Sequence, residues 1–118
     1  MSTFINFSNH PSSTWGEKQI QESLKFGEIT DIPFPYINAD CSEEKIEELV
    51  QEYTDKIMSF HPAAVMAQGE FTLIFGVVHK LLENGILVLS GCAERQVEEI
   101  GDTKISRFNF VRYRAYRL

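Results

Sequence analysis

The stretch Ala63-Ala64-Val65-Met66-Ala67-Gln68-Gly69-Glu70, followed by the apolar run 71–83, decides the fold of this chain. Small and apolar residues at 63–67 predict a short buried strand, and Gln68-Gly69-Glu70 predicts a tight turn. The run 71–83 predicts a helix, which Asn84-Gly85 ends as a C-cap. A strand that leads directly into a helix is the repeating unit of parallel α/β sheets.

The same unit recurs on either side of this stretch. Expected strands are 3–7, 28–32, 63–67 and 86–89, and expected helices are 14–26, from Asp40 or Ser42 to about 60, and 71–83. Thr14 and Glu17 have the spacing of a capping box at a helix start, whereas Ser90-Gly91 indicates the end of the fourth strand. Short connections between alternating strands and helices predict a parallel sheet, most simply with strand order 2-1-3-4.

The C-terminal part departs from this alternation. Segments 95–100 and 103–116 flank Gly101-Asp102, which predicts an antiparallel β-hairpin. We therefore expect one α/β domain over residues 1–118, with a Rossmann-like parallel sheet of four strands, helices on both faces and an appended hairpin.

The helix expected at 71–83 is apolar around nearly its whole circumference. A helix of this kind is usually buried on all sides. One side can face the sheet, and the other needs a second cover. A second subunit and the C-terminal hairpin are the two candidates, of which we favour the subunit and hence a homodimer.

Composition and charge exclude several classes of protein. The formal net charge is −6, but residues 1–100 carry −10 and residues 101–118 carry +4. An acidic chain is a poor binder of long nucleic acid, whereas a local basic patch suits a small anion. No run is long enough to span a membrane, and residues 1–7 do not resemble a signal peptide. These features predict a cytoplasmic protein.

The chain also lacks the usual metal and cofactor motifs. Cys41 and Cys92 fit no zinc or redox spacing, and the three histidines are scattered, so we expect reduced thiols and no metal. There is no G-x-G-x-x-G, no P-loop and no G-x-S-x-G elbow, so we expect no cofactor.

Ligands of open parallel sheets bind beyond the carboxyl ends of the strands, where the strand order reverses. Here that point lies between the first and third strands. The loops expected there supply the candidate ligand-binding residues Asn9, Ser13, Gln68, Gly69, Glu70, Phe71, Ser90 and Gly91. The start of the helix at 71 favours an anion, although Gly69 would equally serve a tight turn alone.

Four further residues are candidates for chemistry at this edge. His10 can act as an acid, a base or a phosphate donor, and Arg95 can neutralise a phosphate. Ser12 and Thr72 offer hydroxyl groups. Arg112 and Arg114 are second choices for binding. For any one of these residues a turn, a cap or a solvated surface position is the competing interpretation.

Several motifs in fixed order suggest a family. They are Asn6-Phe7-Ser8-Asn9-His10-Pro11-Ser12 with Trp15, Gly27-Glu28-Ile29, Asp31-Ile32-Pro33-Phe34-Pro35, Gln68-Gly69-Glu70-Phe71-Thr72, Glu94-Arg95 and Phe110-Val111-Arg112-Tyr113-Arg114. As a set, spanning residues 4–116, they resemble small stand-alone CRISPR-associated proteins of type III loci, from the CARF-like and ring-nuclease group.

The resemblance implies a CARF-like, usually dimeric fold that binds cyclic oligoadenylate, with cyclic tetraadenylate as the first candidate. It also implies metal-independent cleavage of that messenger as a ring nuclease, with His10, Ser12, Thr72 and Arg95 as candidate catalytic residues. Two other functions stay open, a module that binds the messenger without cleaving it and a protein-interaction subunit.

Overall fold

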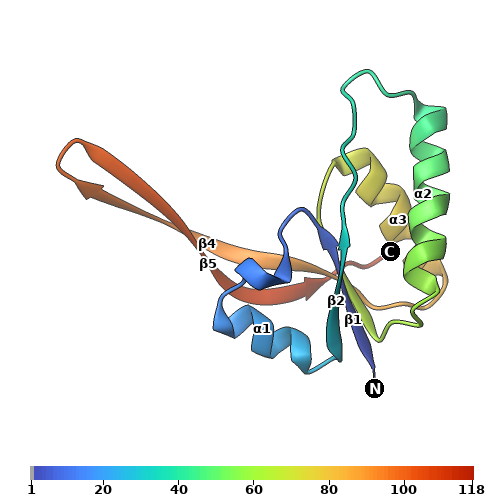
Figure 1. The fold of residues 1–118 in the computed structure, drawn as a ribbon, viewed down its shortest axis with the longest axis horizontal. Helices are drawn as coiled ribbons and strands as arrows, with labels where there is room; N and C mark the ends of the chain where they lie inside the picture. Colours follow the sequence, from blue (N-terminus) through green and yellow to red (C-terminus); the bar gives the residue numbers. More distant parts are fainter. Residues whose placement is uncertain (1) are drawn as a thin grey trace.

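A five-stranded sheet with the order β2-β1-β3-β4-β5 organises the computed structural model, which describes residues 2–118 (Figure 1). The strands are β1 Thr3–Ser8, β2 Glu28–Pro33, β3 Ala64–Ala67, β4 Val88–Ile100 and β5 Thr103–Ala115. Strands β1 to β4 pair in parallel, and β5 pairs antiparallel to β4. The predicted α/β class and the predicted order 2-1-3-4 are therefore confirmed.

Helices cover both faces of the sheet. They are the 3-10 turn η1 Ser12–Thr14 and the α-helices α1 Glu17–Leu24, α2 Glu43–Met58 and α3 Phe71–Glu83. Helices α2 and α3 bury the larger cluster, around Phe7, Val65 and Leu73. The smaller cluster on the α1 face joins Phe4 and Met66 with the half-buried Trp15 and Phe26, among others.

The expected helix boundaries hold except at the first helix. Ser42 caps α2, since its hydroxyl accepts a hydrogen bond from the Lys45 backbone N–H at 3.1 Å. The capping box at Thr14 is wrong, because the Thr14 hydroxyl instead donates to the Pro11 carbonyl at 2.7 Å. Helix α1 begins three residues later, at Glu17, after an extended Gly16.

The fourth strand does not end at Ser90-Gly91. It runs on to Ile100, so the last parallel strand and the first hairpin strand are one element, and the sheet has five strands. Ser90 and Gly91 stay in the ladder opposite Arg114 and Tyr113. The only interruption of this pairing is a register shift between Cys92 and Ala93. A β-bulge bends a strand without ending it.

Beyond this shift the two strands project from the body as a ribbon, which we call the arm, residues 94–109 (Figure 1). The predicted Gly-Asp turn closes its tip, where Gly101 adopts φ +63°. Most of the arm's side chains are exposed. No helix within residues 2–118 is both long and apolar enough to cross a membrane.

Helix α3 is not buried on all sides, contrary to the expectation from its composition. Phe71 is 88% exposed and Phe75 is 75% exposed. Its other sides contact the sheet and α2, where Gly76 lies so close to Val50 that a Cβ would clash. The arm points away from this face, so the hairpin does not supply the second cover (Figure 1).

Candidate functional site

The ends of β1 and β3 lie side by side, as the topology requires. Phe7 pairs with Ala67, and the Gln68 backbone N–H donates to the Phe7 carbonyl at 3.1 Å. The loop after β1 and the turn after β3 therefore leave the sheet together. This is the point at which strand order reverses, and in parallel sheets such a point forms a crevice.

A buried amide holds the loop that follows β1. The Asn6 side-chain Nδ2 donates to the His10 carbonyl at 2.9 Å and to Asp31 Oδ1 at 3.1 Å. Its Oδ1 accepts from the Ser8 hydroxyl at 2.7 Å, and the His10 backbone N–H donates to Ser8 Oγ at 3.1 Å. Asp31 Oδ2 accepts from the Ser12 backbone N–H at 3.0 Å. The hydrogen-bonding atoms of Asn6 are thus paired, which offsets the cost of burying them.

Trp15 is fixed by the same loop. Its indole Nε1 donates to the His10 carbonyl at 3.1 Å, so that carbonyl accepts from both Asn6 and Trp15. The ring packs against the buried cluster that contains Phe4 and Met66. A half-buried indole with its N–H satisfied presents a rigid aromatic surface.

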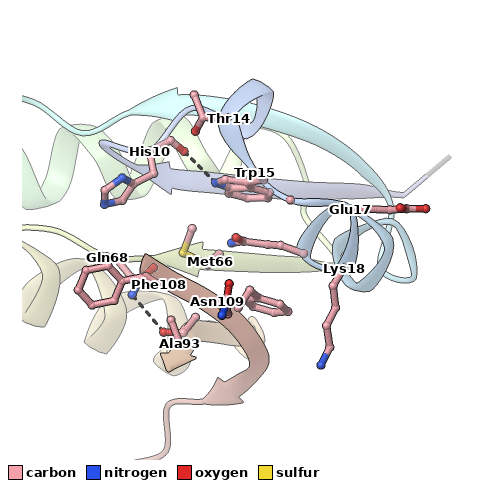
Figure 2. Close-up of a pocket in the computed structure, with 14 residues that line it drawn as sticks. His10, Thr14, Trp15, Glu17, Lys18, Met66, Gln68, Ala93, Phe108 and Asn109 are labelled. Atoms are coloured by element: carbon pink, nitrogen blue, oxygen red, sulfur yellow. Dashed lines mark hydrogen bonds between the residues drawn. The ribbon is translucent and has the colours of Figure 1, made fainter. Parts of the chain in front are cut away.

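A groove of about 690 Å³ opens beside Trp15, on the α1 face of the sheet (Figure 2). In Figure 2 His10 and Trp15 lie on one side of the groove, and Phe108 and Asn109 on the other. The groove is lined by His10, Thr14, Trp15, Gly16, Glu17, Lys18, Gln19, Met66, Gln68, Gly91, Ala93, Phe108, Asn109 and Phe110. Aromatic rings, three side-chain amides, one lysine and one histidine therefore converge on one hollow.

Gln68, directly after β3, lines the groove and contacts β4. Its Nε2 donates to the Gly91 carbonyl at 3.3 Å. A Cβ at Gly91 would lie 3.3 Å from Gln68 Oε1, so the lack of a side chain at Gly91 keeps this contact open.

The start of α3 is already occupied by a carboxylate of the chain. Glu70 accepts from the backbone N–H groups of Thr72 at 3.1 Å and Leu73 at 2.9 Å, and from the Thr72 hydroxyl at 2.6 Å. These bonds, the hydroxyl first, lower the pKa of Glu70 below its usual value. An added anion reaches these amides only if the Glu70 side chain moves away.

Gly69 serves the packing of the turn. A Cβ at this position would overlap the ring of Phe34, which is buried beneath it. Glu70 and Thr72 line a separate hollow of about 410 Å³, between the start of α3 and residues 37–47. Glu70 and Thr72 therefore lie at a different hollow from Gln68, which lines the groove beside Trp15.

The structure brings only some of the candidate residues together. His10, Gln68 and Gly91 line the groove, whereas Asn9, Ser13 and Phe71 are exposed away from its lining. Arg95 lies on the arm, where its guanidinium donates to Ser106 Oγ at 3.1 Å. Arg112 donates to the Tyr113 carbonyl at 2.9 Å. Ser90 pairs with Arg114 within the sheet.

Sequence reasoning missed most of the groove wall. The missed residues are Thr14, Trp15, Gly16, Glu17, Lys18, Gln19, Met66, Ala93, Phe108, Asn109 and Phe110. The register of β5 against β4 brings Phe110 opposite Ala93 and Phe108 opposite Arg95, and no local pattern reveals that register. No group of three or more His, Cys, Asp or Glu side chains within residues 2–118 is arranged to hold a metal ion.

The fold and the groove define a small α/β protein with a ligand-sized hollow at the strand ends. A family model described as "Uncharacterized protein MJ1673 family" matches residues 2–114, and the chain belongs to that family. No curated protein matches the chain. One similar solved structure is the UDP-GlcNAc 2-epimerase from Neisseria meningitidis bound to UDP-GlcNAc, with 18% identity and a TM-score of 0.46. The match covers 75% of this chain and 30% of the epimerase chain.

Proposed function

We propose that the groove binds the nucleotide units of a cyclic oligoadenylate, with cyclic tetraadenylate as the first candidate. The observation that carries the proposal is the convergence of Trp15, Gln68 and Lys18 on one groove at the strand ends. A volume of about 690 Å³ lies within the range of small-ligand sites, roughly 300–1,000 Å³. The resemblance to type III CRISPR-associated proteins supplies the choice of messenger.

The groove offers the three kinds of contact that an adenylate needs. Trp15, Phe108 and Phe110 give flat surfaces on which a base can stack. The amides of Gln19, Gln68 and Asn109 can donate to and accept from the edge of adenine. Lys18 and His10 can neutralise or bond phosphate oxygens, with Glu17 as the one acidic side chain in the lining.

Cleavage at this site would use the ligand's own hydroxyl. The 2′-oxygen attacks the neighbouring phosphorus, forming an O2′–P bond while the P–O5′ bond breaks. The 2′-hydroxyl proton passes to a base, and the 5′-oxygen takes up a proton, so the products are a 2′,3′-cyclic phosphate and a 5′-hydroxyl. His10 is the candidate for one of these transfers, and holding the attacking oxygen in line is the main task of the groove.

One observation favours the alternative, a module that binds the messenger without cleaving it. His10 is the one histidine in the lining, whereas cleavage needs one group to take up the 2′-hydroxyl proton and another to protonate the 5′-oxygen. Arg95, expected as a catalytic cation, bonds Ser106 on the arm, and Lys18 takes its place as the candidate cation.

The proposal fits the other features of the chain. A net charge of −6 disfavours long nucleic acid but leaves a small anionic ring as a ligand. A protein acting on this messenger would work in the cytoplasm. We propose no metal and no further cofactor, and we keep the homodimer as part of the proposal.

The test is to incubate the protein with cyclic tetraadenylate in EDTA and to measure binding by calorimetry and products by mass spectrometry. Linear products with 2′,3′-cyclic phosphate ends support the ring nuclease. Binding with intact ligand supports the sequestering module. Absence of binding to rings of four and six adenylates overturns the nucleotide proposal and favours the protein-interaction subunit.

Matched variants locate the site. Trp15→Ala removes the stacking surface, and we expect affinity to fall roughly tenfold or more, since one base stack contributes about 1–3 kcal/mol. Lys18→Ala is compared with Lys25→Ala, which removes a lysine beyond the end of α1 whose ammonium pairs with Glu22. Equal binding by both lysine variants and by Trp15→Ala would exclude this groove.

A further inference from the structure

We infer that the groove selects a base with an exocyclic amino group, because the side-chain amides of Gln19 and Gln68 offer a ligand their oxygen atoms as hydrogen-bond acceptors. In adenine the matching donor is the N6 amino group. This inference rests on the proposed function, since it names the part of the nucleotide that the two amides contact and the bases that they reject.

A backbone carbonyl fixes the orientation of the Gln68 amide. A carbonyl oxygen only accepts hydrogen bonds, so the end of the amide that lies 3.3 Å from the Gly91 oxygen is Nε2, which donates (Figure 2). The other end, Oε1, lies 3.3 Å from the point that a Cβ of Gly91 would occupy. The ring of Phe110, which lines the groove, comes within 3.9 Å of the same point. Gln68 Oε1 therefore lies on the groove side of the sheet, near an aromatic ring.

Two hydroxyl groups fix the orientation of the Gln19 amide. The Ser23 hydroxyl donates its one proton to the Gln19 backbone carbonyl at 2.7 Å. In its 2.7 Å contact with the Tyr113 hydroxyl Ser23 therefore accepts, and the phenol proton is used there. The Tyr113 oxygen can then only accept from the Gln19 side chain, so Nε2 is the end that lies 3.2 Å from it. Oε1 is again the end that remains.

Both amide oxygens are open to a ligand. Among residues 2–118 no side chain or backbone group donates to Oε1 of either glutamine. The one buried side-chain oxygen or nitrogen without a partner in this part of the chain is the Thr54 hydroxyl, so the two oxygens of the half-buried glutamines are accessible. Each amide is thus held by its nitrogen and offers its oxygen to the groove.

Acceptors of this kind distinguish the parts of a nucleotide. Phosphate oxygens and the ring nitrogens of adenine are acceptors themselves, so they gain no hydrogen bond from an amide oxygen. The N6 amino group is the donor on the edge of adenine. A base that stacks on Trp15 or Phe110 presents this edge to the amides. A site that pairs with an N–H group rejects an analogue without it, because the acceptor is then left unpaired.

The first test compares two rings that differ only at this amino group. One is cyclic tetraadenylate, and the other is the same ring built from purine riboside, in which hydrogen replaces the amino group. Quenching of Trp15, the single tryptophan of the chain, measures binding in a stopped-flow instrument before any turnover. We expect the purine riboside ring to bind wild type about tenfold more weakly or worse, which corresponds to the net strength of about one hydrogen bond.

The two proposals fail in different ways in this test. Equal affinity for both rings overturns the inference and leaves the proposed function standing, since contact through the ribose 2′-hydroxyl would give that result. Binding of neither ring overturns the proposed function and the inference together. The comparison uses the wild-type protein, so it does not depend on the folding of a variant.

The second test assigns the selectivity to the amide. Gln68→Met keeps an unbranched side chain and removes the acceptor. We expect it to weaken cyclic tetraadenylate about tenfold and to change the affinity for the purine riboside ring less than about twofold. Gln19→Met should act in the same direction. The control is Gln51→Met, because the Gln51 amide bonds Asp55 and Lys80 on the α2 and α3 side of the sheet. If Gln68→Met weakens both rings equally, the amide only supports the shape of the groove and the inference is overturned.

Discussion

The side-chain amide of Asn6 donates a hydrogen bond to the backbone carbonyl of His10 at 2.9 Å. It thereby joins a buried position of β1 to an exposed loop beside the groove. The same carbonyl accepts from the indole of Trp15, so one buried side chain helps to set the position of both a candidate acid–base residue and a candidate stacking surface. The side of the groove that carries His10 and Trp15 is therefore held in place by a buried side chain of the sheet.

Replacing Asn6 by leucine should lower stability and disturb the groove together. The change keeps a similar volume but removes one hydrogen-bond partner each from the His10 carbonyl, Asp31 and Ser8, a cost of about 1–3 kcal/mol. Urea denaturation measures the loss, and Trp15 fluorescence reports the groove. Asn9→Leu, in the exposed part of the same loop, is the control. Equal stability of the two variants would show that the buried amide does not hold the loop.

Gly69→Ala should destabilise the turn between β3 and α3. The new Cβ overlaps the Phe34 ring, and overpacking of this kind typically costs about 1–3 kcal/mol. Gly16→Ala is the control, because nothing lies within 4 Å of its Cβ position. The double variant Gly69→Ala, Phe34→Leu should recover part of the lost stability, which thermal unfolding measures. If Gly69→Ala is as stable as the control, the ring can shift freely and the interpretation is wrong.

Much of the fold follows from local patterns in the sequence. Helix α3 begins and ends where its apolar run and Asn84-Gly85 predict, and the tip of the arm lies at Gly101-Asp102. Ser90-Gly91 misleads, because both residues are typical of strand ends but here remain paired with β5. Ladder pairing with a distant segment overrides local propensity.

The candidate site could be predicted only where it depends on strand ends. His10 and Gln68 follow β1 and β3 directly, and both line the groove. Phe108 and Asn109 reach it through a register set by the bulge at Cys92 and Ala93, which no spacing in the sequence reveals. The Glu70 cap did carry a signal, since an acidic residue directly before a helix can accept from its first N–H groups.

Glu70→Gln should reduce stability at neutral pH and not at acid pH. The folded pKa of Glu70 lies below its ordinary value of 4.5, chiefly because the Thr72 hydroxyl donates a hydrogen bond to the carboxylate. The contribution of this charge to the free energy of unfolding is therefore fully present above the pKa of Glu70 in the unfolded chain. It is lost as the pH falls through the pKa of Glu70 in the folded protein. We expect a deficit of about 0.3–1 kcal/mol at pH 7, the usual size of a charge at a helix terminus.

Urea unfolding at pH 7 and at pH 3 measures this difference. Glu44→Gln, an exposed acid in the first turn of α2 that is not its cap residue, is the control for loss of a surface charge. A deficit for Glu70→Gln that is the same at both pH values would mean that the carboxylate charge does not matter there.

The Tyr113 hydroxyl joins β5 to α1 through hydrogen bonds. Removing this hydroxyl should lower the stability of the protein by an amount that depends on pH. Ser23 Oγ donates to the Gln19 carbonyl at 2.7 Å, so in the 2.7 Å contact between Ser23 Oγ and the Tyr113 hydroxyl it is Tyr113 that donates. Gln19 Nε2 donates to the same phenol at 3.2 Å. Tyr113→Phe loses both bonds, and we expect a loss of about 0.5–1.5 kcal/mol at pH 7.

The pH dependence follows from the raised pKa of Tyr113, caused first by burial. Because the pKa of Tyr113 is raised in the folded protein, its hydroxyl contributes fully to the free energy of unfolding below the unfolded value of 10.0. This contribution is lost as the pH rises through the folded pKa. The difference in free energy of unfolding between wild type and Tyr113→Phe should therefore become smaller above pH 10. The control Tyr36→Phe, at an exposed position, should leave the free energy of unfolding unchanged at pH 7. Urea unfolding from pH 7 to pH 11 measures both. A gap that widens with pH would mean that the ionised phenol is the better partner of Ser23, and that the hydroxyl does not act as the donor joining β5 to α1.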